Sequence, residues 1–229
     1  MRRRGRIIFL NGTSSSGKSS IAAALLTVLD QPWFHMSVDA INSMRSKNRT
    51  LELEPAELDA VLARTRAGFH RAVAGMAEAG NDVIVDHVLS EQWRLIDCLR
   101  VLDGYEVVFV AVRCSPDVLA RRERARGDRE PGHAAGQQEQ VHAHGIYDLE
   151  CDTALASPHE NARRIKEFLA GPERPTAFDR LRLALLNSPN HEEVSLCHLH
   201  SGIRPSQHPA MPSLSCPLQG GRRRSSPRR

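Results

Sequence analysis

The fold of this chain is most constrained by one loop motif, Gly12-Thr13-Ser14-Ser15-Ser16-Gly17-Lys18-Ser19, which matches the pattern G-x4-G-K-[ST] in full. A short apolar run of β type, Ile7 to Leu10, precedes it, and Ser19 to Leu29 follows with apolar residues at helical spacing before Pro32. A strand, a glycine-rich turn and a helix in this order predict a phosphate-binding loop. A Gly/Ser-rich loop that only resembles the motif is the alternative, and the two flanking elements argue against it.

The residues of this motif suit a bound nucleotide. Glycines let the backbone turn tightly so that its N–H groups face the phosphates, and the helix that begins at Lys18 offers its positive dipole end to the same anion. We expect Lys18 to reach the β- and γ-phosphates and the Ser19 hydroxyl to be a ligand of Mg²⁺. ATP and Mg²⁺ are therefore the predicted cofactors. The predicted nucleotide-binding residues are Gly12, Thr13, Ser14, Ser15, Ser16, Gly17, Lys18, Ser19 and Ser20.

Residues 5 to 172 continue as alternating strands and helices. Further strands are predicted at 33–38, 83–85, 107–112 and 147–151, and helices at 56–79, 91–102, 116–124 and 160–170. The predicted buried stripe of the long helix consists of Leu58, Val61, Leu62, Phe69, Val73 and Met76. The later strands lack strict alternation, as is typical of strands covered on both faces of a parallel sheet. We predict an α/β fold of the P-loop NTPase type, a mostly parallel sheet with helices on both faces and ligands at the carboxyl ends of its strands.

Two aspartates are predicted to lie at that ligand-binding edge. Asp86 closes the apolar strand Val83 to Val85, where we expect it to hold Mg²⁺ directly or through water; a helix cap or a surface residue is the alternative. Asp39 ends the second strand, and a carboxylate there can accept the proton of an acceptor hydroxyl while orienting it for in-line attack. The alternative for Asp39 is an N-cap of a helix that starts at Ala40.

An arginine-rich segment follows the predicted helix at 116–124. Its members are Arg121, Arg122, Arg124, Arg126 and Arg129. A charge run is usually a solvated helix face, but Gly127, Pro131 and Gly132 can hinge a segment that closes over the γ-phosphate. We predict Arg126 and Arg129 to be lid arginines with a catalytic role and assign the other three to the surface.

The charge distribution divides the chain after residue 172. Of 31 basic and 27 acidic residues, nine arginines and four acids lie in residues 173–229, so this part has net charge +5 and residues 1–172 have −1. Seven of the 13 prolines also lie in the second part. We predict one domain over 1–172 and a basic, mostly disordered tail over 173–229. Within that tail, Phe178 to Leu186 can form a short helix, either docked on the domain or free.

Composition also indicates the cellular compartment and the kinds of partner to expect. No run of about 18 apolar residues exists, so a membrane span or a secretory signal is not expected. The five cysteines are widely spaced and contain no CxxC pair, which is typical of a reducing compartment, and we predict a cytoplasmic location. Contact with nucleic acid is expected at most through the basic tail.

The quoted residues together resemble the family of chloramphenicol phosphotransferase and related small P-loop kinases, over about residues 6 to 170. The resemblance rests on Ile7 to Gly12, Ser14-Ser15, Gly17-Lys18-Ser19, Pro32-Trp33, Val38-Asp39, Ile84-Val85-Asp86, Val112-Arg113-Cys114, Ala125 to Arg129, Tyr147-Asp148 and Asp152-Thr153. It implies ATP-dependent phosphorylation of a hydroxyl group on a small molecule, with Asp39 as the base, Lys18 on the phosphates, and Arg126 and Arg129 in the lid.

The chain departs from that family pattern at two places. His87 stands where relatives carry a second acid, and the segment Ile41 to Leu53 is charged, unlike the drug-binding stretch of the antibiotic kinase. The second departure argues against chloramphenicol as the natural acceptor.

The predicted function is therefore an ATP-dependent small-molecule O-phosphotransferase, and three alternatives remain. A nucleoside or sugar-nucleotide kinase would need a base-stacking pocket, for which aromatic residues at 4% supply few candidates. A nucleotide-dependent binding module would use the basic tail to hold nucleic acid. A hydrolytic P-loop ATPase would turn over ATP without an acceptor. The sequence leaves the acceptor and the oligomeric state open.

Overall fold

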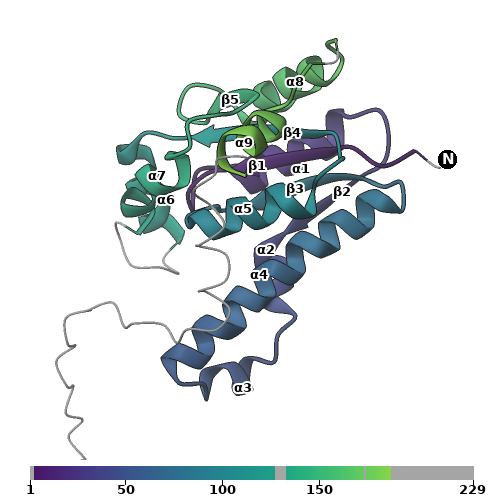
Figure 1. Ribbon diagram of the computed structural model, residues 1–229. Coiled ribbons are helices and arrows are strands. Elements are labelled where there is room, and N and C mark those ends of the chain that lie inside the picture. The colour runs from purple at the N-terminus through teal and green to yellow at the C-terminus, as the bar shows by residue number, and fades with distance from the viewer. Residues whose placement is uncertain (1–2, 127–132, 173, 187–229) are drawn as a thin grey trace, which may run out of the picture. The chain divides into compact units, whose positions relative to one another are not determined.

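A single parallel sheet organises the part of the chain that the computed structural model describes, residues 3–126, 133–172 and 174–186. Its five described strands are β1 (Ile7–Asn11), β2 (Trp33–Ser37), β3 (Asp82–His87), β4 (Val107–Arg113) and β5 (Leu149–Asp152). They lie in the order β2-β3-β1-β4-β5, with every pair parallel (Figure 1). Asn11 is in register with His87 and Ala111, and Ser37 with Asp86, so the carboxyl ends of the central strands meet at one edge.

Helices connect these strands and cover both faces of the sheet. Their bounds are α1 (Lys18–Val28), α2 (Val38–Ser43), α3 (Lys47–Leu51), α4 (Pro55–Glu78), α5 (Gln92–Val101), α6 (Pro116–Arg126), α7 (His133–His142), α8 (Pro158–Leu169) and α9 (Ala177–Leu185). Within the described residues, no helix combines the length and apolar character needed to cross a bilayer. The α/β fold predicted from the sequence is confirmed.

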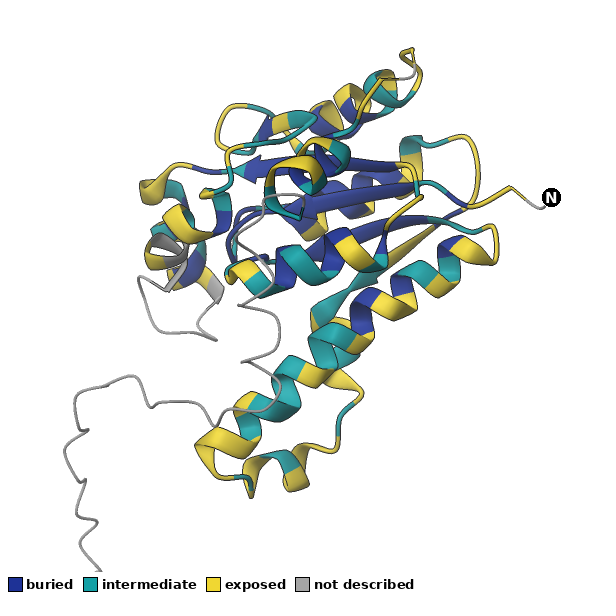
Figure 2. Cartoon of the chain, in the orientation of Figure 1, coloured by how far each residue is buried: buried dark blue, intermediate teal, exposed yellow. Residues whose placement is uncertain are grey.

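The core consists of two apolar layers, one on each side of the sheet, shown in dark blue in Figure 2. Successive side chains of a strand point to opposite faces. Ile8 and Leu10 of β1 therefore pack in the layer that contains α1 and α8, whereas Ile7 and Phe9 pack in the layer that contains α4, α5 and α9. All four of these side chains are almost completely buried, which explains why the strand reads as a continuous apolar run.

The region after β2 differs from the sequence-based prediction. The second strand ends at Ser37 because its hydroxyl accepts a hydrogen bond from the Ala40 backbone N–H and starts α2. Asp39 therefore lies in the first turn of α2, neither at the end of a strand nor at the N-cap. The helices α3 and α7 were not predicted, and α2 was considered only as the alternative of a helix that starts at Ala40.

The long helix α4 extends past the sheet. It begins at Pro55, where Glu54 and Glu57 form a capping box. Phe69 and Val73 in its second half are buried as predicted. The predicted burial of Leu58, Val61 and Leu62 is wrong, because the first half of α4 runs beyond the sheet toward α3 and these side chains are only partly buried (Figure 1).

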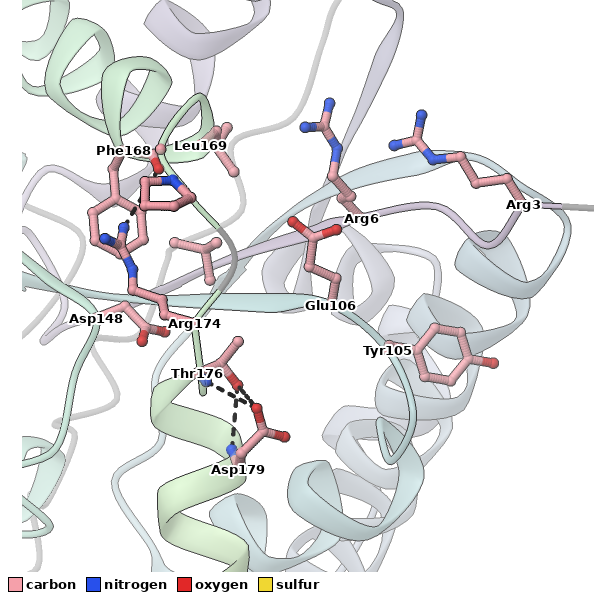
Figure 3. Close-up of a pocket in the computed structure, with 13 residues that line it drawn as sticks. Arg3, Arg6, Tyr105, Glu106, Asp148, Phe168, Leu169, Arg174, Thr176 and Asp179 are labelled. Atoms are coloured by element: carbon pink, nitrogen blue, oxygen red, sulfur yellow. Dashed lines mark hydrogen bonds between the residues drawn. The ribbon is translucent and has the colours of Figure 1, made fainter.

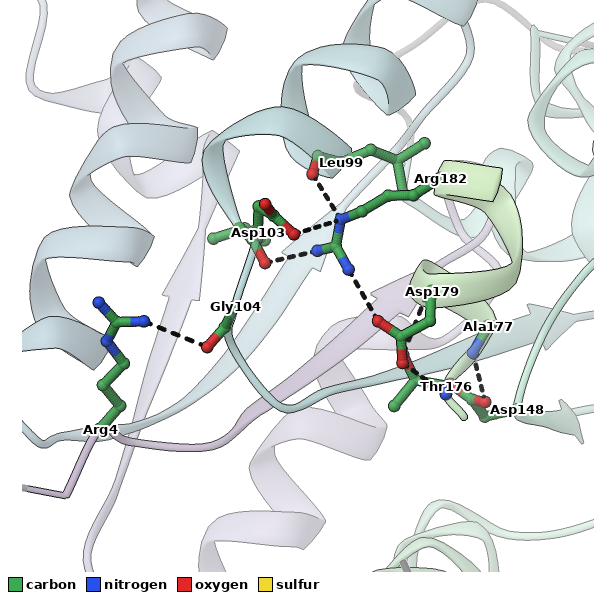
Figure 4. A network of polar contacts seen from close by, with 10 residues as sticks. Arg4, Leu99, Asp103, Gly104, Asp148, Thr176, Ala177, Asp179 and Arg182 are labelled. Carbon is green, nitrogen blue, oxygen red and sulfur yellow. Dashed lines mark hydrogen bonds and ion pairs between the residues drawn. The ribbon is translucent and has the colours of Figure 1, made fainter. Parts of the chain in front are cut away.

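The helix α9 packs on the sheet, which decides between the docked and free alternatives for this segment. Phe178 and Leu181 are buried in the layer that contains Phe9. Its first turn is held by Asp148, whose carboxylate accepts a hydrogen bond from the backbone N–H of Ala177 (Figure 4) and another from that of Phe109 in β4. Arg182 donates to the carbonyl oxygens of Leu99 and Leu102 at the end of α5. The chain from residue 187, which includes most of the predicted tail, lies outside the described residues.

Replacing Thr176 with alanine is expected to lower the free energy of unfolding by about 1 kcal/mol. The Thr176 hydroxyl accepts a hydrogen bond from the Asp179 backbone N–H at 3.2 Å, and the Asp179 carboxylate accepts one from the Thr176 N–H at 2.8 Å, so the substitution removes half of a capping box. Urea unfolding of the full chain measures the change. The variant Thr176→Ser keeps the hydroxyl and should retain most of the stability; equal stability of Thr176→Ala and the wild type would contradict a docked α9.

Candidate active site

The loop between β1 and α1 leaves no room for side chains at its two glycines. A Cβ atom on Gly12 would lie 2.3 Å from the Val112 carbonyl oxygen of β4, which is a steric clash. Gly17 has φ +100°, in the left-handed region, and a Cβ there would lie 3.0 Å from Cγ2 of Thr153. The loop is therefore folded closely against β4 and the segment after β5.

The start of α1 is suited to an anion. Gly17 is its N-cap and provides no side-chain cap, and the first turn contains no acidic residue. The first N–H groups of the helix and its dipole are thus directed at the loop without a carboxylate to neutralise them. The hydroxyl of Ser16 is buried and has no hydrogen-bond partner in the described part of the chain. These features fit the phosphates of a nucleotide.

Lys18, Ser19 and Asp86 come together beside this loop. Lys18 Nζ donates to the Thr13 carbonyl oxygen at 2.7 Å and lies 3.9 Å from Asp86 Oδ1, while the Ser19 hydroxyl donates to Asp86 Oδ2 at 2.6 Å. Burial alone would raise the pKa of the Asp86 carboxyl, but contacts with His35, Lys18 and Ser19 outweigh it and hold the pKa below its ordinary value. Asp86 is therefore an ionised, buried carboxylate at the foot of the phosphate loop.

Ser19 and Asp86 also fit Mg²⁺. The described residues contain no group of three or more His, Cys, Asp or Glu placed to hold a metal ion. Mg²⁺ does not require one, because it commonly uses one or two protein oxygens and completes its shell with phosphates and water. Ser19 and Asp86 supply two such oxygens next to the phosphate loop. The sequence predicted Asp86 directly after a strand that ends at Val85, but β3 continues to His87, so Asp86 is the second-last residue of the strand.

Arg122 and Thr153 hold the loop from the side of β4. Arg122 Nη1 donates to Thr153 Oγ1 at 2.9 Å and lies 3.3 Å from the carbonyl oxygens of Ser15 and Ser16. The Thr153 hydroxyl donates to the Ser16 carbonyl at 2.6 Å. The assignment of Arg122 to the solvent-exposed surface is therefore wrong: it is half-buried, because α6 turns it toward the loop, whereas Arg121 and Arg124 are exposed.

Replacing Arg122 with alanine is expected to weaken the binding of MgATP about tenfold, equivalent to about 1.4 kcal/mol. The reason is that the loop loses its hydrogen bonds to the guanidinium and its backbone N–H groups are less well ordered before the nucleotide binds. Titration calorimetry with a non-hydrolysable ATP analogue measures the affinity. Arg121→Ala is the matched control, since Arg121 is exposed on the same helix, and it should bind the analogue normally.

A second polar network joins the end of β1 to α7. Asn11 Nδ2 donates to the Tyr147 hydroxyl at 2.8 Å and to the Val141 carbonyl at 3.0 Å, and Asn11 Oδ1 accepts from the Leu89 N–H. His142 Nδ1 lies 2.7 Å from the same hydroxyl. Burial lowers the pKa of His142 to about 4, so this imidazole is neutral at physiological pH. The network links α7, which follows the predicted lid, to the strand that carries the phosphate loop.

His87 lies on the opposite face of β3 from Asp86. Its Nε2 is 3.2 Å from His70 Nε2, and His70 Nδ1 is 2.7 Å from Asp97 Oδ2, so three residues from β3, α4 and α5 form a chain of contacts. Burial, followed by the charges of His70, Arg94 and Arg66, lowers the pKa of His87 well below its ordinary value. His87 is therefore a neutral, buried residue that faces α4, away from Ser19.

Of the remaining predicted site residues, the structure describes Asp39 and Ser20 fully, Arg126 only in its backbone, and Arg129 not at all. Asp39 is exposed on α2, two residues after β2 ends beside Asp86. Ser20 is exposed in the first turn of α1. Arg126 is the last residue of α6, but its side chain is outside the described part, and Arg129 lies in the segment 127–132 that the structure does not describe.

A separate cavity of about 630 Å³ lies at the other edge of the sheet (Figure 3). Its wall includes three residues that directly precede strands, namely Arg6, Glu106 and Asp148. Residues at and after the end of α8 also contribute to the wall. Ligands of parallel α/β sheets bind at the carboxyl ends of the strands. The phosphate loop, and not this cavity, therefore defines the candidate active site.

The sheet order, the loop after its central strand and the buried Lys18–Asp86 arrangement define the class of protein as one with a P-loop kinase fold. Residues 5–170 match the family described as "Chloramphenicol phosphotransferase-like protein", and the chain belongs to this family of phosphotransferases. The resemblance stated from the sequence is confirmed.

Individual relatives agree with this membership. The chain is 33% identical over 213 residues to a Mycobacterium tuberculosis protein named as a proposed O-phosphotransferase, covering 80% of this chain and 90% of the relative. Among solved structures, the APS kinase CysC of M. tuberculosis in complex with AMPPNP and APS has a TM-score of 0.55 at 20% identity, covering 73% of this chain and 99% of that one. Shikimate kinase of Acinetobacter baumannii has a TM-score of 0.54 at 10% identity, covering 73% and 94%. The two structures show a shared fold.

Proposed function

We propose that this chain transfers the γ-phosphoryl group of ATP to a hydroxyl group of a small molecule, with Mg²⁺ as cofactor. The observation that carries the proposal is the arrangement of the buried Lys18 and Asp86 with the Ser19 hydroxyl beside a loop suited to phosphates. Family membership supports the same reaction class. Unpaired, buried thiols at Cys98, Cys114 and Cys151 support a reducing location such as the cytoplasm.

In the proposed reaction, the acceptor oxygen forms a bond to the γ-phosphorus while the bond to the bridging β–γ oxygen breaks and ADP leaves. Asp39, on α2 at the carboxyl edge of the sheet, takes the hydroxyl proton and orients the attacking oxygen. Lys18 and the N–H groups of the loop stabilise charge on the transferred group. Ser19 and Asp86 would hold Mg²⁺, which would offset the negative charge of the phosphates.

Closure of the site is a further part of the proposal. Arg126 and Arg129 follow the half-buried Arg122 along the same segment, and we assign them the role of lid arginines over the γ-phosphate. A closed lid excludes water, which would otherwise compete with the acceptor and hydrolyse ATP.

The test is transfer from γ-labelled ATP, with Mg²⁺, to a pooled panel of hydroxylated compounds that includes chloramphenicol, nucleosides and aminoglycosides. We expect label on one class of acceptor and little free phosphate. Release of labelled phosphate without any labelled acceptor, at a rate that Asp39→Asn does not change, would replace the proposal with a hydrolase.

A further inference from the structure

Arg66 lies on α4, one helical turn from a residue that contacts the carboxyl end of β3. It lies four residues before His70 on α4, and residues four apart on a helix are neighbours on one face. His70 contacts His87 at the carboxyl end of β3. Figure 1 shows that the first half of α4 continues beyond the sheet toward α3, so Arg66 lies one turn further out along α4 than His70.

The guanidinium of Arg66 has no counterion in the described part of the chain. The side chain is half-buried, yet no hydrogen bond or ion pair joins it to a described residue. Nearby Arg45, by contrast, donates to Asn42 and Thr65. A partly exposed guanidinium without a protein partner has its N–H donors available for an anionic ligand.

The acidic residues that contact the neighbours of Arg66, and the ionised Asp86 of β3, are already engaged. Each of them has a basic or hydroxyl partner of its own: Glu91 pairs with Arg94, Asp97 with Arg71 and His70, and Asp86 with Ser19 and Lys18. These pairings leave Arg66 without a carboxylate of its own among the described residues.

Two buried groups lie next to Arg66, the cationic Arg94 and the neutral His87. Arg94 is 6% exposed, and burial together with the charge of Arg66 lowers the pKa of its guanidinium, which indicates that the two cations are close enough to repel. His87 is 1% exposed and its Nδ1 has no hydrogen-bond partner in the described residues. An anion bound here would relieve the repulsion.

We propose that Arg66 binds an oxyanion group, a carboxylate, sulfate or phosphate, on the acceptor, and that this enzyme therefore selects acidic hydroxyl compounds. The proposal rests on the proposed function and names its substrate class. Arg66 would hold the anionic end of the acceptor while its hydroxyl group lies at the carboxyl edge that also carries Asp39 and the phosphate loop.

The test uses pairs of acceptors that differ only in the anionic group: hydroxy acids with their primary amides, and polyols with their monosulfate and monophosphate esters. Transfer from MgATP by the full chain is measured for each pair. We expect kcat/KM to be at least about tenfold higher for the anionic member, and the preferred group to identify which oxyanion is recognised. Equal transfer to both members of every pair would overturn the proposal.

Variants assign this preference to one side chain. Arg66→Gln is expected to raise KM for the anionic acceptor by about 10- to 100-fold, with kcat for that acceptor and KM for ATP unchanged. Arg66→Lys, which keeps the charge, should recover part of the loss, and Arg64→Gln, at an exposed position of the same helix, should behave as the wild type. An unchanged KM in Arg66→Gln would also overturn the proposal.

A binding measurement separates failure of this proposal from failure of the proposed function. The full chain, saturated with Mg²⁺ and a non-hydrolysable ATP analogue, is titrated with inorganic sulfate and with phosphate at constant ionic strength while Tm is recorded. Stabilisation of the wild type but not of Arg66→Gln would support an anion site even if no acceptor were phosphorylated. An equal response of the two proteins would count against that site, whether or not the chain is a kinase.

Discussion

Replacing Lys18 with alanine is expected to lower the rate of phosphoryl transfer by about 10²- to 10³-fold, the largest effect that we expect from removing a single charge. Lys18 is 6% exposed and lies between the phosphate loop, at the Thr13 carbonyl, and Asp86. In this buried position its charge is only weakly screened, so it acts strongly on the group that is transferred. The substitution would also remove the ammonium group that lies 3.9 Å from the buried Asp86 carboxylate, which should lower the transfer rate further.

Single-turnover transfer of labelled phosphate measures this effect, and circular dichroism shows whether the variant is folded. Lys166→Ala is the matched control, because Lys166 lies on α8 and pairs with the exposed Asp30. Exposed pairs of this kind contribute little, so its transfer rate should remain normal. Transfer by a folded Lys18→Ala protein at more than about a tenth of the wild-type rate would exclude the assigned role of Lys18.

Replacing Asp39 with asparagine is expected to reduce transfer by about 10²- to 10⁴-fold while the affinity for ATP stays the same. Asparagine keeps the size of the side chain but cannot take the proton of the acceptor hydroxyl. Asp39 is on α2, outside the phosphate loop, so nothing in its position predicts a contact with the phosphates. The two substitutions therefore act on different steps: Lys18→Ala on the transferred group, and Asp39→Asn on the attacking oxygen.

Measurement of kcat and of ATP affinity for the same protein distinguishes these steps. Asp117→Asn serves as the control, since Asp117 is an exposed aspartate in the first turn of another helix, α6. A normal kcat in Asp39→Asn would move the base to another residue. Loss of ATP affinity in this variant would instead indicate that α2 contributes to the nucleotide site.

The fold and the phosphate loop could be predicted because their signals are local. The strand Ile7–Asn11, the two required glycines and the helix from Lys18 are adjacent in the chain, and each carries its own pattern of apolar residues or backbone conformation. The position of Asp86 at the loop follows from the same logic, since parallel strands bring their carboxyl ends to one edge. Family membership could be predicted from these local motifs as well.

The residues that surround the loop could not be predicted in the same way. Arg122 and Ser16 are 106 residues apart, and Thr153 is 137 residues from Ser16, so nothing in the local sequence distinguishes Arg122 from the exposed arginines beside it. The chain of contacts from His87 through His70 to Asp97 likewise joins three elements. Of these missed features, only α2 had a local sequence signal: Ser37 is a residue type that favours the N-cap position, and Ala40 lies at the N3 spacing from it.

The sequence by itself determined the phosphate loop, the parallel α/β fold and the candidate pair Ser19 and Asp86, because short-range periodicity and a strand-end position specify them. Only the tertiary structure decided that Arg122 contacts the loop, that α9 docks on the sheet and that Arg66 lies without a counterion in the described residues beside buried Arg94. These features depend on which face of a helix meets which strand. The packing of helix faces on strands is determined by the burial of apolar surface over the whole domain, so it cannot be predicted from any single segment of the chain.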